Sequence, residues 1–118
     1  MTTNSPRVAG LLEFLEVDTD SLYKVTQTAA KGGPKHLIAG HLYRAIEDYT
    51  QADRDYTLAL ASLGMKVETE VENAAAGFAP NPMWIEQATQ QAIAAAAKMA
   101  ETAKLAMTTN AVRKAMSL

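Results

Sequence analysis

Apolar residues recur at steps of three and four along most of this 118-residue chain, which is the spacing of one buried stripe on an α-helix. The longest stripe predicts a single helix over residues 35–76, about 60 Å long if it is continuous. Gly64 costs such a helix about 1 kcal/mol relative to alanine, so the helix either continues through this residue or bends there. The stripe consists of Leu37, Ile38, His41, Leu42, Ala45, Ile46, Tyr49, Ala52, Tyr56, Leu60, Leu63, Val67, Val71, Ala74 and Ala75.

Residues 6–31 predict shorter helical segments before the long helix. Ser5 provides a capping hydroxyl, and Pro6 suits the first position of a helix. The pattern falters at residues 17–20, where Asp18 or Asp20 could cap a second segment, so the region is either one bent helix or two helices. The sequence Lys-Gly-Gly-Pro at 31–34 ends helicity and forms a hinge.

Residues 82–116 predict a final helix that is rich in alanine. It follows a turn at 77–82 that contains a glycine and two prolines, where we expect Phe78 to pack against a helix end. Asn81 caps the predicted helix and Pro82 opens it. Its stripe consists of Trp84, Ile85, Ala88, Ala92, Ala95, Ala96, Met99, Ala103, Ala106 and Met107.

These elements predict an all-α fold in a single domain, 1–118. Three or four helices, two of them long, would form an elongated helical hairpin or a bundle with Gly/Pro hinges. A helix of 42 residues is too long for a compact globule of this size unless it breaks near Gly64.

Composition narrows the possible functions. The formal net charge of −2 and the scattered 11 Lys and Arg provide no basic surface for a nucleic acid. Cysteine is absent, which excludes disulfides, thiolate zinc sites and thiol nucleophiles. The N-terminal segment has acidic residues inside its apolar run, and no segment is long and apolar enough to cross a bilayer. We therefore expect a soluble protein without a cleavable signal peptide, and its location stays open.

The polar residues of the segment 36–57 could suggest a site, but their spacing favours an ordinary helix. His36 and His41 are five residues apart and cannot share a metal as a pair four residues apart can. We interpret His41, which falls on the apolar stripe, as a core or interface residue. Most of the carboxylates at 47, 48, 53 and 55 should face solvent, as should the glutamates at 68, 70 and 72. No phosphate-binding loop, nucleophile elbow or zinc-protease motif is present, so we expect no enzyme, no cofactor and no metal site.

The alanine stripe of the last helix predicts a surface for close helix packing. Alanine contributes little burial, so such a face is useful only where another backbone comes near. We predict a non-catalytic interaction or self-assembly protein whose partner is a second copy or another helical protein. The predicted interface consists of Ala92, Ala95, Ala96, Met99 and Ala103 as a seam, with Tyr49, Tyr56 and Trp84 as anchors. The alternative is a metal- or small-molecule-binding bundle in which His36, His41, Tyr43 and Glu47 converge with residues of other helices.

Two short segments resemble known families. The segments YTQAD at 49–53 and YRAIE at 43–47 are similar to the Tyr-x-x-x-Asp/Glu element of helical-hairpin substrates of type VII secretion. In that family the element follows the hairpin, whereas here it lies in a helix. The segments GHLYRA at 40–45 and TTNAV at 108–112 resemble subunits of bacterial refractile-body ribbons. We assign the chain to neither family, but export by a specialised, signal-peptide-independent system is a further alternative.

Overall fold

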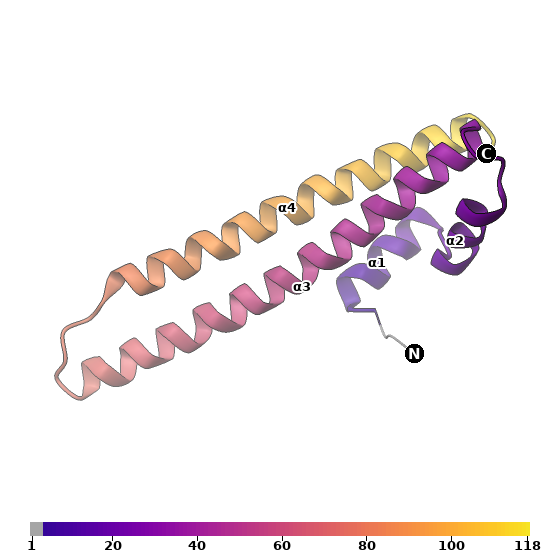
Figure 1. Ribbon diagram of the computed structural model, residues 1–118. Helices are drawn as coiled ribbons and strands as arrows, with labels where there is room; N and C mark the ends of the chain where they lie inside the picture. The colour runs from indigo at the N-terminus through magenta and orange to yellow at the C-terminus, as the bar shows by residue number, and fades with distance from the viewer. Residues whose placement is uncertain (1–3) are drawn as a thin grey trace.

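The computed structural model describes residues 4–118, which form four α-helices in an elongated molecule of 66 × 26 × 22 Å (Figure 1). The helices are α1 (Pro6–Leu15), α2 (Thr19–Thr28), α3 (Pro34–Ala75) and α4 (Pro82–Ala115). The two long helices, α3 and α4, run antiparallel beside each other and form a hairpin, while α1 and α2 lie near one end (Figure 1). The predicted all-α, elongated hairpin with two long helices is confirmed.

The long helix α3 is continuous through Gly64, where a bend was one of the two expectations. Its 42 residues span about 63 Å at 1.5 Å per residue, which accounts for the length of the molecule. It begins directly after Gly33, at the proline that the sequence indicates as a start. Beyond its end, Gly77 has a left-handed φ of 90°, a conformation that glycine adopts without steric cost. The hinge residues therefore fix both ends of this helix.

The N-terminal region consists of two helices rather than one bent helix. The Ser5 hydroxyl accepts the backbone N–H of Val8 at 3.2 Å and caps α1. The Asp18 carboxylate accepts the N–H of Asp20 at 3.1 Å and caps α2. Between them, Glu16 takes a left-handed φ of 56° and ends α1.

The tip of the hairpin is closed by a contact that the sequence does not indicate. Asn81 stands before α4 as expected, but its side chain accepts no capping hydrogen bond. Instead its backbone N–H donates to the carboxylate of Glu70, at 2.7 Å, and Glu70 is buried. The expectation that Phe78 packs against a helix end is wrong, because this side chain is 68% exposed.

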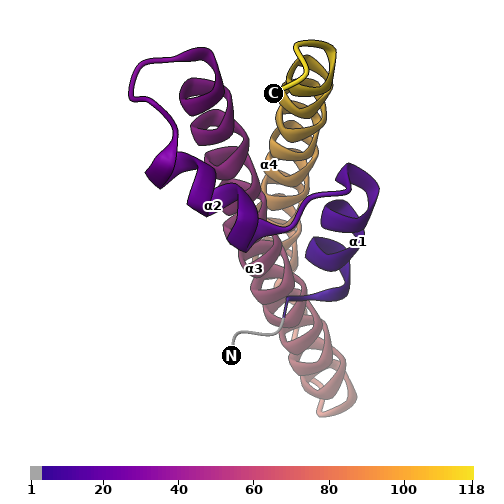
Figure 2. The ribbon, with the colours of Figure 1, turned by 90° about the vertical axis from the view of Figure 1, so that its right-hand side faces the viewer.

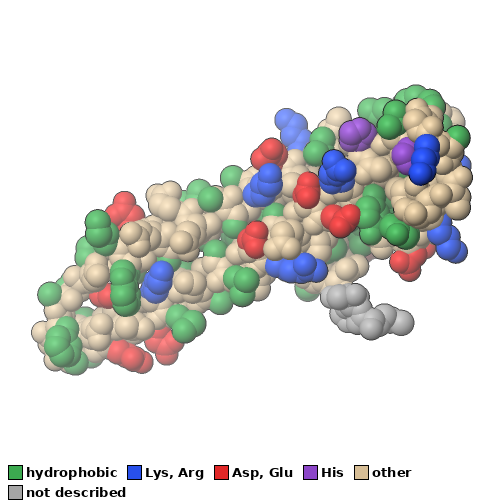
Figure 3. All heavy atoms as spheres, viewed as in Figure 1, with side chains coloured by type: hydrophobic (Ala, Val, Ile, Leu, Met, Phe, Trp, Pro, Cys, Tyr) green, Lys and Arg blue, Asp and Glu red, His purple; other side chains and the backbone are tan. Residues whose placement is uncertain are grey.

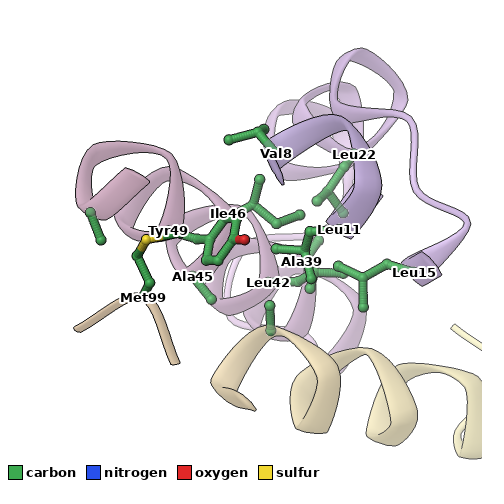
Figure 4. Packing of buried hydrophobic residues seen from close by; sticks show 12 residues of the cluster. Val8, Leu11, Leu15, Leu22, Ala39, Leu42, Ala45, Ile46, Tyr49 and Met99 are labelled. Atoms are coloured by element: carbon green, nitrogen blue, oxygen red, sulfur yellow. The ribbon is translucent and has the colours of Figure 1, made fainter. Parts of the chain in front are cut away.

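The hydrophobic core lies at the end of the hairpin that α1 and α2 cover. In Figure 2, α1 lies to the right of α3 and α2 to its left. Figure 4 shows Leu11 of α1 close to Leu42 of α3, with Ile46 and Leu22 beside them. We call this part the base, residues 4–57 and 98–118. The remainder, residues 58–97, consists of two helices and the tip, and we call it the arm.

Candidate interaction surfaces

An ion pair fixes α1 against α3 where the base meets the arm. The Arg7 guanidinium donates to the Asp53 carboxylate and, at 2.7 Å, to the Thr57 hydroxyl. The guanidinium carbon also lies 5.2 Å from the centre of the Tyr56 ring, a cation–π distance. Most of the carboxylates at 47, 48, 53 and 55 face solvent as expected, and Asp53 is the one that is buried. Arg7 remains partly exposed, with a side-chain exposure of 44%.

The ion pair changes the acidity of Asp53. Burial by itself raises the pKa of this carboxyl, but hydrogen bonds from Ser5 and Arg7 and the positive charge of Arg7 outweigh burial and hold the pKa below its usual value. Asp53 is therefore charged at neutral pH in the folded protein. The 46 residues that separate Arg7 from Asp53 explain why periodicity along the chain gives no signal for this pair.

Much of the predicted alanine seam contacts α3 within the same chain. Ala92 and Met99 are buried, and Ala95 and Ala103 are half-buried, all along the side of α4 that packs on α3. Ala96 is exposed. Close helix packing of small residues is thus present, but the neighbouring backbone belongs to the hairpin itself. Contact of these residues with a second copy stays a prediction, and Ala96 is the seam residue most open to it.

The three predicted anchors lie in different environments. Tyr49 is buried in the base, where burial and the charge of Asp53 raise its pKa. Tyr56 is half-buried beneath the Arg7 guanidinium. Trp84, near the tip, is 47% exposed. Of the three, Trp84 is the most accessible to another molecule.

The arm exposes many large apolar side chains. On the face seen in Figure 3, apolar side chains (green) lie at the surface along the left-hand part of the molecule. The large apolar residues that the arm exposes are Leu58, Leu60, Met65, Val67, Val71, Phe78, Met83, Trp84 and Ile93. The buried residues of the arm are Ala59, Glu70, Ala88 and Ala92, none of which has a large apolar side chain. Contacts between α3 and α4 in the arm therefore bury only part of its apolar surface.

Over the residues that the structure describes, His36 and His41 do not form a cluster with other side chains of the kind that bind metal ions. His36 lies at the start of α3, where its Nδ1 accepts the N–H of Gly32 at 3.3 Å. The sequence predicts His41 in the core or at an interface; it is exposed, so it does not belong to the core, and its place at an interface stays a prediction. Among residues 4–118, no three His, Asp or Glu side chains lie together as a metal site would require. A hollow of about 370 Å³ beside α2 and α3, lined by Thr19, Tyr43, Ile46, Glu47, Asp48, Thr50, Gln51 and Arg54, is open to solvent.

The comparisons with known proteins returned no similarity: no family model, no curated protein and no solved structure matches the chain. Neither short resemblance in the sequence gains support from them. Within the described part of the chain, no helix has the length and hydrophobicity that crossing a membrane requires.

Proposed function

We propose that the protein is a non-catalytic helical interaction protein that assembles through its arm, with a second copy of itself as the principal partner. The observation that carries the proposal is the exposure of large apolar side chains along both helices of the arm. Burying one such side chain stabilises a protein by about 1.5–3 kcal/mol. An arm that leaves so many of them in water gains much from any partner that covers them.

The geometry of a hairpin explains why a partner is needed. An amphipathic helix of a globular protein buries a stripe at least about 100° wide. In the base, α4, α1 and α2 together cover such a stripe on α3. In the arm, the helix that packs against α3 is α4. A single neighbour leaves the flanks of the stripe open. Residues such as Leu60, Val67 and Ile93 lie on those flanks and are 41%, 40% and 55% exposed.

The test is the mass in solution, measured by light scattering after size exclusion over a hundredfold range of protein concentration. We expect a dimer or larger species whose share rises with concentration. A monomer throughout the range, up to about 100 μM, would contradict self-assembly. A foreign helical protein would then be the remaining candidate partner for the arm.

A further inference from the structure

The helix α1 packs on one face of the hairpin and contacts both long helices there. At its N-terminal end, Arg7 contacts Asp53, Tyr56 and Thr57 of α3. At its C-terminal end, the side-chain amide of Asn110 in α4 donates to the Leu15 carbonyl oxygen at 3.0 Å. α1 therefore lies over both long helices, on one face of the hairpin. Its N-terminal end, at Arg7, stands where the arm begins.

The same face continues into the arm without a cover. Seven residues are nearly two turns of helix, so positions seven apart lie one above the other. Leu60 and Val67 stand seven and fourteen residues after Asp53, and Ala96 stands fourteen residues before Asn110. We call this surface the arm face, and it consists of Leu60, Val67, Val71, Ile93 and Ala96. All five residues are exposed.

The opposite side of the arm also exposes apolar side chains. A hollow there is lined by Asp55, Leu58, Ala59, Ser62, Gln91 and Ala95, which places Leu58 and Gln91 on one side. Met65 lies seven residues after Leu58, and Trp84 lies seven residues before Gln91. Polar residues lie among the apolar ones on both sides, because on the arm face Glu86 stands seven residues before Ile93 and Thr89 seven residues before Ala96. What distinguishes the arm face is that it continues the surface that α1 covers in the base.

We propose that the arm face binds the arm face of a second copy in the antiparallel direction, so that the two arms form a four-helix bundle. This inference rests on the proposed function and specifies its surface. The position of α1 favours the antiparallel direction. In a parallel dimer the two α1 helices would collide and hold the arms apart. In an antiparallel dimer each arm occupies the space just beyond the α1 of its partner.

The charges of the chain favour the same direction. The arm contains four of the 13 acidic residues and one of the 11 basic residues. Three of its glutamates, Glu68, Glu70 and Glu72, lie together near the tip. The residues outside the arm are close to neutral, with nine acidic and ten basic side chains. A parallel dimer would bring two acidic tips together, while an antiparallel dimer places each tip beside the nearly neutral part of its partner.

The size of the arm face sets the expected affinity. The arm is about 27 Å long and two helices, or about 20 Å, wide. Its footprint of roughly 500 Å² per copy is smaller than the roughly 800 Å² per partner of a standard interface. We therefore expect a dissociation constant in the micromolar range, which the concentration series described above covers.

The experiment compares two neighbouring residues on opposite sides of the arm. Val67→Glu places a carboxylate in the centre of the arm face, and Met65→Glu places the same group on the other side, at a residue that is 69% exposed. We expect Val67→Glu to raise the dissociation constant of the dimer at least about 100-fold, because a twofold dimer would bury two unpaired charges. Met65→Glu should change it less than about 3-fold. Ile93→Glu, on the other helix of the arm face, should act like Val67→Glu, and circular dichroism checks that each variant is folded.

The possible outcomes separate this inference from the proposed function. Loss of the dimer in Val67→Glu and Ile93→Glu, but not in Met65→Glu, supports the arm face. A dimer that tolerates Val67→Glu and Ile93→Glu, or that Met65→Glu disrupts equally, overturns the arm face but leaves self-assembly intact. A wild-type protein that stays monomeric overturns both.

A single cysteine at the tip tests the direction, and the chain has no cysteine of its own to interfere. Spin labels on Ala79→Cys should lie about 30 Å apart in an antiparallel dimer, because the two tips then stand at opposite ends of the paired arms. A separation below about 15 Å, or ready formation of a tip-to-tip disulfide, would overturn the antiparallel arrangement.

Discussion

The base and the arm are built from the same two helices, yet they bury their side chains very differently. In the base, α1 and α2 add to the hairpin, and large residues such as Leu15 and Leu42 are almost fully covered. In the arm, the buried apolar residues are alanines, and leucines such as Leu58 remain 69% exposed. The apolar stripe of α3 continues through both regions, so the difference comes from the number of neighbouring helices. A third helix, rather than a stronger stripe, is what completes a core.

The largest expected effect is on the free energy of unfolding, when one leucine of the base is compared with one of the arm. Leu42→Ala removes a side chain with 0% exposure and leaves a cavity, so we expect a loss of about 2–5 kcal/mol in the free energy of unfolding. Leu58→Ala removes an exposed side chain and should change this free energy by less than about 0.5 kcal/mol. Chemical denaturation of both variants measures the difference. Equal losses would show that the arm is packed as firmly as the base.

The next effect concerns the ion pair at the border of the two regions. Asp53→Asn keeps the shape of the side chain but removes its charge, and we expect it to lower the free energy of unfolding by about 1–2 kcal/mol. The matched control is Asp55→Asn, because Asp55 is exposed on the same helix. Hydrogen exchange in α1 should rise in the first variant and stay unchanged in the second. An Asp53→Asn variant as stable as the wild type would mean that α1 is held by apolar contacts alone.

Acid should weaken the same contact. The pKa of Asp53 is lower in the folded protein than its usual value of 3.8, so the unfolded chain binds a proton more readily than the folded one. The stabilisation is therefore complete above about pH 4 and is lost as the pH falls through the folded-state pKa. Thermal melts between pH 2 and pH 7 should show a steeper acid decline for the wild type than for Asp53→Asn. Parallel curves would contradict this role of the carboxylate.

The smallest expected effect is a gain in the stability of the arm. Gly64 lies inside α3, and an added Cβ would meet no atom within 4 Å. Gly64→Ala should therefore stabilise the arm by about 0.5–1 kcal/mol through the higher helix propensity of alanine. The helical signal at high temperature measures this gain. A loss of stability would indicate that the helix needs a bend at this position.

The elements of the fold could be predicted from the sequence, but the neighbours of each surface could not. Ser5 and the Gly33-Pro34 hinge mark helix starts because capping and backbone restriction act locally. The alanine stripe correctly indicates close packing of a helix, but a stripe does not name its neighbour, and here much of it faces α3. The pairing of Arg7 with Asp53 depends on where α1 docks, which no local pattern specifies. The candidate surface on the arm depends in the same way on where α1 packs.

Hydrogen exchange measured by mass spectrometry at about 1 μM and about 100 μM protein tests the central claim most directly. At the low concentration, amides of the arm should exchange faster than those of the base, because the arm has fewer packing neighbours. At the high concentration, protection should rise along residues 58–75 and 82–97, while the base stays unchanged. Arm protection that is already equal to that of the base at 1 μM, and independent of concentration, would contradict the claim that a second copy completes the arm.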